Sequence, residues 1–115
     1  MAGSTSGVFF TKNGDDVDMV FLRGKKINFD VVWPNPITGY KARLRAMRSS
    51  DSTPLLEMTV DNSIIEVDTA LKTFHHRMTS SQSAAIQAFE GVWVYDLIDD
   101  QDEPQQIFSG KFKAV

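Results

Sequence analysis

Apolar and polar residues alternate along much of the chain, which is the pattern of β-strands with one buried and one solvated face. Residues 27–33 show it most clearly, because every odd-numbered position is a large apolar residue, whereas Asn28 and Asp30 fall on the other face. Pro34 and Pro36 end this stretch, since proline has no N–H to donate to a sheet ladder. The pattern therefore predicts a strand that turns its odd-numbered residues toward a core.

Other stretches predict further strands. Residues 40–46 alternate as regularly, and the side chains expected to face inward are Tyr40, Ala42, Leu44 and Ala46. Residues 92–98 are apolar on both faces, which is typical of a strand in the middle of a sheet. The remaining predicted strands are 7–11, 17–24, 54–60, 63–68, 71–78 and 105–115.

Turn signals separate these strands. Asn13-Gly14 predicts a tight turn, and Asp61-Asn62 predicts a hairpin between the strands on either side of it. About seven or eight short strands at this spacing indicate an all-β domain, either a β-sandwich or a barrel.

Only the region 80–90 has a helical pattern. Thr79 or Ser80 can cap this helix, with Gln82 or Ser83 placed to answer the cap. The expected apolar stripe and the expected end of the helix are Ala85, Ile86, Phe89 and Gly91. Two or three turns are too few for a stable isolated helix, so we expect this segment to pack over one end of the sheets.

Length and composition fit one domain, residues 7–115, preceded by a flexible arm of small polar residues, 1–6. With no cysteine, the chain has no disulfide framework, thiolate metal site or cysteine nucleophile. No apolar run approaches the ~18 residues of a membrane span, and the first residues lack the pattern of a signal peptide. A net charge of −3 argues against a nucleic-acid partner.

The residues that could carry chemistry do not assemble into a catalytic pattern. His75 and His76 are neighbours in a predicted strand and point to opposite faces, so a pair with one buried and one exposed ring is favoured over a metal site or a base. Solvated turns are favoured over calcium loops for the acidic clusters Asp15, Asp16 and Asp18, and Asp99, Asp100, Asp102 and Glu103. We therefore expect no catalytic residue, no metal, no cofactor and no enzymatic activity.

Two groups of residues are candidates for binding another protein. Lys41, Arg43 and Arg45, followed by Arg48, form a basic stripe, which could contact an acidic partner or a nucleic acid, although the solvated face of a strand is the favoured interpretation. An edge strand or the arm could also extend a neighbour's sheet, and the residues expected to contact that neighbour are Val8, Phe9 and Phe10.

Three large rings allow a different interpretation. Trp33, Trp93 and Tyr95 could stack on sugars or on nucleic-acid bases, although in a sandwich such rings more often fill the core.

The order of motifs resembles a family of small phage tail and baseplate domains, which includes the amino-terminal domain of baseplate upper proteins. The segments that carry the resemblance cover roughly residues 20 to 115 and are FLRGKKINFDVVW, ITGYKARLRAMRSSDSTPLLEMTV and MTSSQSAAIQAFEGVWVYDLIDDQDEPQQIFSGKF. Within them lie a TGY-x-A-x-L strand, an S-x-x-Q-x-A-A helix, a strand ending in Y-D-L, an acidic turn and a G-x-F strand. Unlike baseplate upper proteins, the chain is expected to have no coiled coil or fibre domain after the sandwich.

The resemblance implies an immunoglobulin-like β-sandwich made in the host cytoplasm and built into the virion, in several copies per particle. The implied role is an adaptor of the tail, baseplate or neck that docks fibres or neighbouring virion proteins, with no catalytic residues, no nucleic acid and no membrane. The alternatives are a capsid decoration protein and a carbohydrate-binding module for host recognition.

Overall fold

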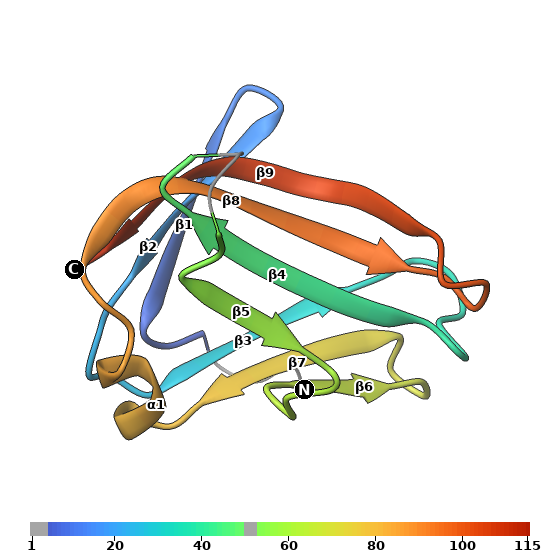
Figure 1. Ribbon diagram of the computed structural model, residues 1–115. Coiled ribbons are helices and arrows are strands. Elements are labelled where there is room, and N and C mark those ends of the chain that lie inside the picture. Colours follow the sequence, from blue (N-terminus) through green and yellow to red (C-terminus); the bar gives the residue numbers. More distant parts are fainter. Residues whose placement is uncertain (1–4, 50–52) are drawn as a thin grey trace.

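The computed structural model describes residues 5–49 and 53–115, which fold into an all-β sandwich of two sheets and one short helix (Figure 1). One sheet has the strand order β1-β2-β9-β8-β4-β5, with the bounds β1 Val8–Asn13, β2 Asp16–Phe21, β9 Pro104–Ala114, β8 Phe89–Ile98, β4 Lys41–Met47 and β5 Leu56–Thr59. The other has the order β3-β7-β6, with the bounds β3 Ile27–Val32, β7 Thr73–Met78 and β6 Ile65–Asp68. All neighbouring strands are antiparallel except β2 and β9.

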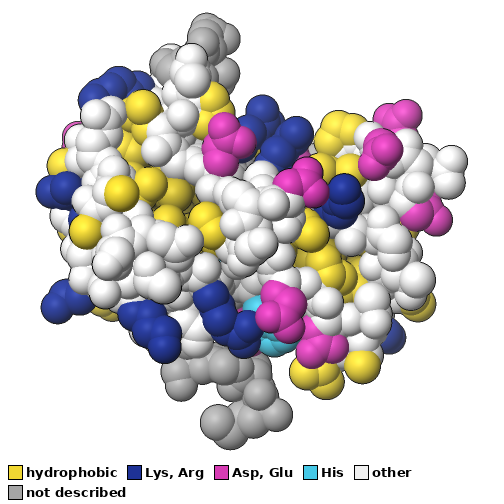
Figure 2. Space-filling view, turned by 60° about the horizontal axis from the view of Figure 1, so that its bottom comes forward, with side chains coloured by type: hydrophobic (Ala, Val, Ile, Leu, Met, Phe, Trp, Pro, Cys, Tyr) yellow, Lys and Arg dark blue, Asp and Glu magenta, His cyan; other side chains and the backbone are white. Residues whose placement is uncertain are grey.

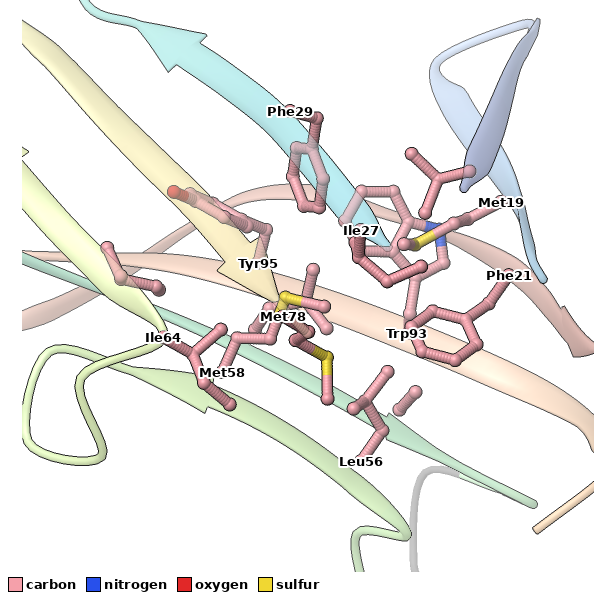
Figure 3. Packing of buried hydrophobic residues seen from close by; sticks show 14 of the residues in the cluster. Met19, Phe21, Ile27, Phe29, Leu56, Met58, Ile64, Met78, Trp93 and Tyr95 are labelled. Carbon is pink, nitrogen blue, oxygen red and sulfur yellow. The ribbon is translucent and has the colours of Figure 1, made fainter. Parts of the chain in front are cut away.

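The alternation in the sequence matches the burial of the strands. In β4, Ala42, Leu44 and Ala46 are buried, as predicted, whereas Tyr40 is only half-buried. Rings and methionines from both sheets meet in the interior, and those labelled in Figure 3 are Met19, Phe21, Ile27, Phe29, Leu56, Met58, Ile64, Met78, Trp93 and Tyr95. This shared interior is the core that the period-2 pattern predicted.

β8 is a central strand, as its two apolar faces predicted. It pairs with β9 on one side and with β4 on the other. The β8–β9 ladder is the longest in the protein and contains one irregularity, after Tyr95, where Asp96 lies opposite Gln106 instead of Ile107. The strand at the end of the sequence is therefore an integral member of the larger sheet.

The predicted hairpin at Asp61-Asn62 is wrong. β5 pairs with β4 in the six-stranded sheet, whereas β6 pairs with β7 in the three-stranded sheet. The Asn62 carboxamide accepts from the amides of Thr59, at 3.0 Å, and Ile64, at 3.2 Å, and so fixes a turn that carries the chain from one sheet to the other. A turn signal reports a change of direction and does not report which sheet receives the next strand.

The helix begins where predicted but is much shorter. α1 spans Ser80–Ala84, and Thr79 caps it in a capping box with Gln82, whose amide donates to the Thr79 hydroxyl at 3.1 Å. Its last cap is Ala85, and the chain enters β8 at Phe89. Within the described residues no helix combines the length and the apolar character needed to cross a membrane.

Gly91 therefore does not end a helix and lies inside β8. A Cβ atom added there would overlap the carbonyl oxygen of Met47, the last residue of β4. Glycine is required at this position because two strand backbones approach closely, which is one of the few reasons for glycine within a strand.

Of the predicted arm, residues 1–4 lie outside the described residues. Ser6 exchanges two backbone hydrogen bonds with Asn28 of β3, at 2.8 and 3.0 Å. Gly7 follows with a φ of +76°, and a Cβ atom added there would lie 2.5 Å from Ile27. The chain therefore changes direction at a residue that must be glycine, between Ser6, which pairs with β3, and the start of β1.

Candidate functional site

The hairpin of β1 and β2 presents an open sheet edge. β1 lies at the end of the six-stranded order and, within the described residues, has β2 as its only neighbour in that sheet. β2 pairs with β9 only through Met19–Phe21, so the tip of the hairpin extends past this ladder and projects from the molecule (Figure 1). An edge strand of this kind can pair with another polypeptide.

The register shows which backbone groups face outward. The Gly7 carbonyl accepts from the Leu22 amide at 2.8 Å, so the backbone groups of the odd-numbered residues of β1 bond to β2. The backbone amides and carbonyls of the even-numbered residues point to the open side of β1, where those of Ser6 already pair with Asn28 of β3. Beyond Ser6, the amides and carbonyls facing this side belong to Val8, Phe10 and Lys12.

The side chains proposed for partner binding differ in accessibility. Phe9 is 62% exposed on the outer face of the sheet, and Phe10 is 39% exposed on the inner face. The expectation for Val8 must be corrected, because its side chain is 4% exposed and belongs to the core. Its buried side chain also means that β1 is part of the domain and is not a free arm that could be donated to a neighbour.

A cleft lies on the inner face of the hairpin, between the hairpin and β3. Its volume is about 170 Å³, and the residues that line it, here called the interstrand cleft, are Phe10, Val17, Phe29, Asp30, Val31, Trp93, Tyr95 and Phe108. Phe10 contacts the Phe29 ring edge-on, with centroids 5.2 Å apart, and lies 6.0 Å from the Trp93 ring. Phe10 thus connects the open edge of β1 to the wall of the cleft.

The Trp and Tyr polar groups around the cleft already have partners. The Trp93 indole N–H donates to the Val17 carbonyl at 2.6 Å, and the Tyr95 hydroxyl donates to His76 Nε2 at 2.8 Å. Rings and methyl groups otherwise dominate the walls. The interstrand cleft consequently suits an apolar group better than a polar one.

His76 is fully buried, as predicted for one of the two histidines, and stacks on Phe29 with ring centroids 4.2 Å apart. Its Nδ1–H donates to the Phe29 carbonyl at 3.2 Å, which leaves Nε2 to accept from Tyr95. Burial lowers the pKa of His76 to about 4, and burial also raises the pKa of Tyr95 well above its usual value. Both groups are neutral near pH 7, and their hydrogen bonds link β7, β3 and β8 inside the core.

His75 is on the opposite face, as predicted, but its ring is only 12% exposed. Nδ1 lies 2.7 Å from Asp30 and Nε2 lies 3.4 Å from Asp68, so the ring bridges β3 to the end of β6. Partial burial opposes protonation, but the bonds to the two carboxylates outweigh it and raise the pKa of His75. Figure 2 shows histidine (cyan) at the surface beside acidic side chains (magenta).

The predicted basic stripe is largely neutralised. Arg43 donates to Asp96 Oδ2 at 2.8 and 3.3 Å, and Arg45 donates to the same oxygen at 3.0 Å. Lys41 lies 3.7 Å from Asp61. Arg43 and Arg45 thus share one carboxylate, Lys41 has another, and Arg48 lies 5.9 Å from the centre of the Phe89 ring. Most of the stripe is therefore engaged within its own domain, which reduces the positive charge that it offers an acidic partner.

The other chemical candidates stay apart. Within 5–49 and 53–115, no group of three or more histidine, aspartate or glutamate side chains is arranged to hold a metal ion. Trp93 and Tyr95 are 3% and 0% exposed, and Trp33 is half-buried, so none of these three rings is a freely exposed platform for sugars.

Sequence reasoning identified Phe10 but missed the cleft beside it. The cleft depends on the position of Val17, which follows from the parallel pairing of β2 with β9. One signal was present: Gly110 lies inside a strand pattern, and a Cβ added there would overlap the Val17 carbonyl. Glycine at such a position indicates close backbone approach, although it does not name the approaching strand.

Comparison of the sequence with protein-family models finds no match, and comparison with curated proteins finds no relative.

Proposed function

We propose that the protein is a structural component of a phage virion, an adaptor of the tail, baseplate or neck that docks fibres or neighbouring subunits. In this proposal the sandwich is immunoglobulin-like, is made in the host cytoplasm and is present in several copies per particle. Repetition in a symmetric particle makes weak contacts effective, because each bound copy raises the effective concentration for the next contact. Neither catalysis nor a cofactor is part of this role.

The observation that carries the proposal is the projecting β1–β2 hairpin. A strand edge with one neighbour exposes backbone donors and acceptors, and natural proteins usually protect such an edge unless it binds something. Phe9, the large apolar side chain most exposed on β1, lies on this edge strand. The two arginines of the basic stripe, in contrast, are held by Asp96, so Arg43 and Arg45 are assigned a structural role.

The carbohydrate-binding alternative is disfavoured by the burial of Trp93 and Tyr95. Decoration of the capsid uses the same kind of surface as attachment to the tail, and imaging can separate these two roles.

The test is cryo-electron microscopy of phage particles made with and without the gene for this chain. We expect density to disappear from the tail, baseplate or neck when the gene is absent. Loss of a knob from the head would replace the adaptor by a decoration protein, and unchanged particles that contain none of the protein would refute a virion role. Removing residues 1–10 is a poor variant for this purpose, since it also removes Val8 from the core.

A further inference from the structure

The open edge of β1 and the interstrand cleft form one site, and we infer that it binds an extended segment of another protein as an added antiparallel strand. The segment would carry a large apolar residue that enters the cleft beside Phe10 and an acidic residue two positions before it, opposite Lys12. This inference deepens the proposed function by naming the chemistry of the docked partner.

The backbone of β1 specifies an extended ligand. The amides and carbonyls of Phe10 and Lys12 face the open side, two residues apart, which is the spacing of hydrogen-bonded pairs in an antiparallel ladder. At Val8 the edge is closed, because Ser6 pairs with Asn28 and brings β3 alongside. An added strand can therefore pair along the stretch from Phe9 to Asn13.

The cleft specifies the side chain that the added strand contributes. Residues directly opposite each other in a ladder point to the same face, so the residue opposite Phe10 points inward with it. A dry cavity of about 150 Å³ accommodates benzene, and the interstrand cleft, at about 170 Å³, is large enough for one ring or one branched aliphatic side chain. Rings of Phe29, Trp93 and Phe108 line it.

Charge specifies the second position. Lys12 shares the inner face with Phe10 and is exposed, and within the described residues its ammonium has no ion-pair partner. A residue directly opposite it in the added strand is in reach of that charge, and an acidic side chain fits it best. A second copy of β1 does not match, since Val8, Phe10 and Lys12 include no acid.

The probe is the labelled peptide Thr-Val-Glu-Val-Phe-Val-Thr, titrated into the purified full chain and followed by fluorescence anisotropy. In antiparallel register its Glu lies opposite Lys12 and its Phe opposite Phe10. We expect replacement of that Phe by Ala to weaken binding roughly 10- to 100-fold. Methylation of the Phe backbone nitrogen, which faces β1, should weaken it about tenfold or more, whereas methylation of the preceding Val nitrogen, which faces away, should have little effect.

Variants of the protein test the two side-chain contacts separately. Val31→Phe fills the cleft from β3 and should abolish the preference for Phe over Ala in the peptide. Val32→Phe is the matched control, because this neighbour is 63% exposed on the opposite face of the same strand, and it should bind like the unaltered protein. Lys12→Glu should weaken binding about two- to fivefold and should favour a peptide with Lys in place of Glu. Circular dichroism confirms that each variant is folded.

Three results would overturn the inference. They are no binding at millimolar peptide, equal binding by both methylated peptides, or self-association of the protein through β1 that the peptide does not displace. All of these measurements use purified protein, so their failure would leave the adaptor role intact if particles lacking the gene still lose tail density.

Discussion

Acid should destabilise the protein through one buried side chain. The His76 ring is stacked on Phe29, donates to a carbonyl and accepts from Tyr95, and these contacts hold it neutral with a pKa of about 4. In the unfolded chain the same ring has a pKa near 6.5. Between pH 6.5 and pH 4 the His76 ring binds a proton in the unfolded state but not in the native state. The free energy of unfolding therefore falls as the pH falls from about 6.5 to about 4.

The size of the loss in unfolding free energy follows from the shift in the pKa of His76. At about 1.4 kcal/mol for each unit of pKa, the full loss is roughly 3 kcal/mol, which is a large part of the 5–15 kcal/mol typical of a domain.

Two other titratable groups, His75 and Asp68, change the stability over different pH ranges. The raised pKa of His75 adds stability that is complete below about pH 6.5 and is lost as the pH rises through the pKa of His75 in the folded protein. Asp68, whose pKa is lowered, adds stability that is lost only as the pH falls below its usual 3.8.

Urea unfolding followed by tryptophan fluorescence, repeated from pH 4.5 to 7.5, measures the dependence. The unfolding free energy should decline by about 2 kcal/mol or more between pH 6.5 and 4.5. His76→Gln should be less stable at pH 7 and nearly flat over that range, whereas His75→Gln should keep the acid decline. An NMR titration of the unaltered protein should give a midpoint near 4 for His76 and one above 6.5 for His75. A flat profile for the unaltered protein, or a midpoint near 6.5 for His76, would refute the reasoning.

Three further substitutions test the contacts that shape the sheets. Gly91→Ala should cost roughly 2–4 kcal/mol, because its Cβ meets the backbone of β4, whereas Gly14→Ala, with open space around it and only a positive φ, should cost about 1 kcal/mol, both measured by urea unfolding. Trp93→Phe should cost about 1–2 kcal/mol by loss of its bond to β2 and should speed hydrogen exchange in β1 and β2 more than in β4. Asp96→Asn should cost roughly 1–3 kcal/mol by leaving two arginines without their carboxylate, and the exposed Asp61→Asn should change stability by less than about 0.5 kcal/mol.

The strands could be predicted from the sequence because each side chain reports which face of its own strand it occupies. Ile27 and Phe29 are buried as expected, and Trp93 and Tyr95 are in the core. The capping box at Thr79 was equally readable, since it depends on residues three positions apart. All of these signals are local.

What could not be predicted depends on pairing between distant segments. Alternation within β5 and β6 is the same whether the strands pair with each other or lie in different sheets. The arginines of β4 alternate outward as expected, but their neutralisation depends on Asp96, which is more than fifty residues away along the chain and comes opposite Arg43 only through the β4–β8 register. Side-chain periodicity excludes a slip of one residue, because such a slip would turn every side chain to the other face. It does not name the partner strand or choose between registers that differ by two residues.

The unequal sizes of the two sheets explain why the candidate site lies at the β1–β2 hairpin. A six-stranded sheet faces a three-stranded one, so the smaller sheet has too few strands to match the larger across its whole width. β3 is joined to the start of β1 by the Ser6 bridge and to its middle by the Phe10–Phe29 ring contact. The hairpin is also held by Trp93 and by the Lys111 amide, which donates to Asp18 at 3.0 Å. These contacts fix β2, and within the described residues they leave the outer edge of β1 without a neighbour beyond Ser6. Every open sheet has edge strands, and β5 ends the same sheet on its other side. The edge of β1 differs in lying beside an apolar cleft, and this combination is the reason for proposing that a partner strand pairs there.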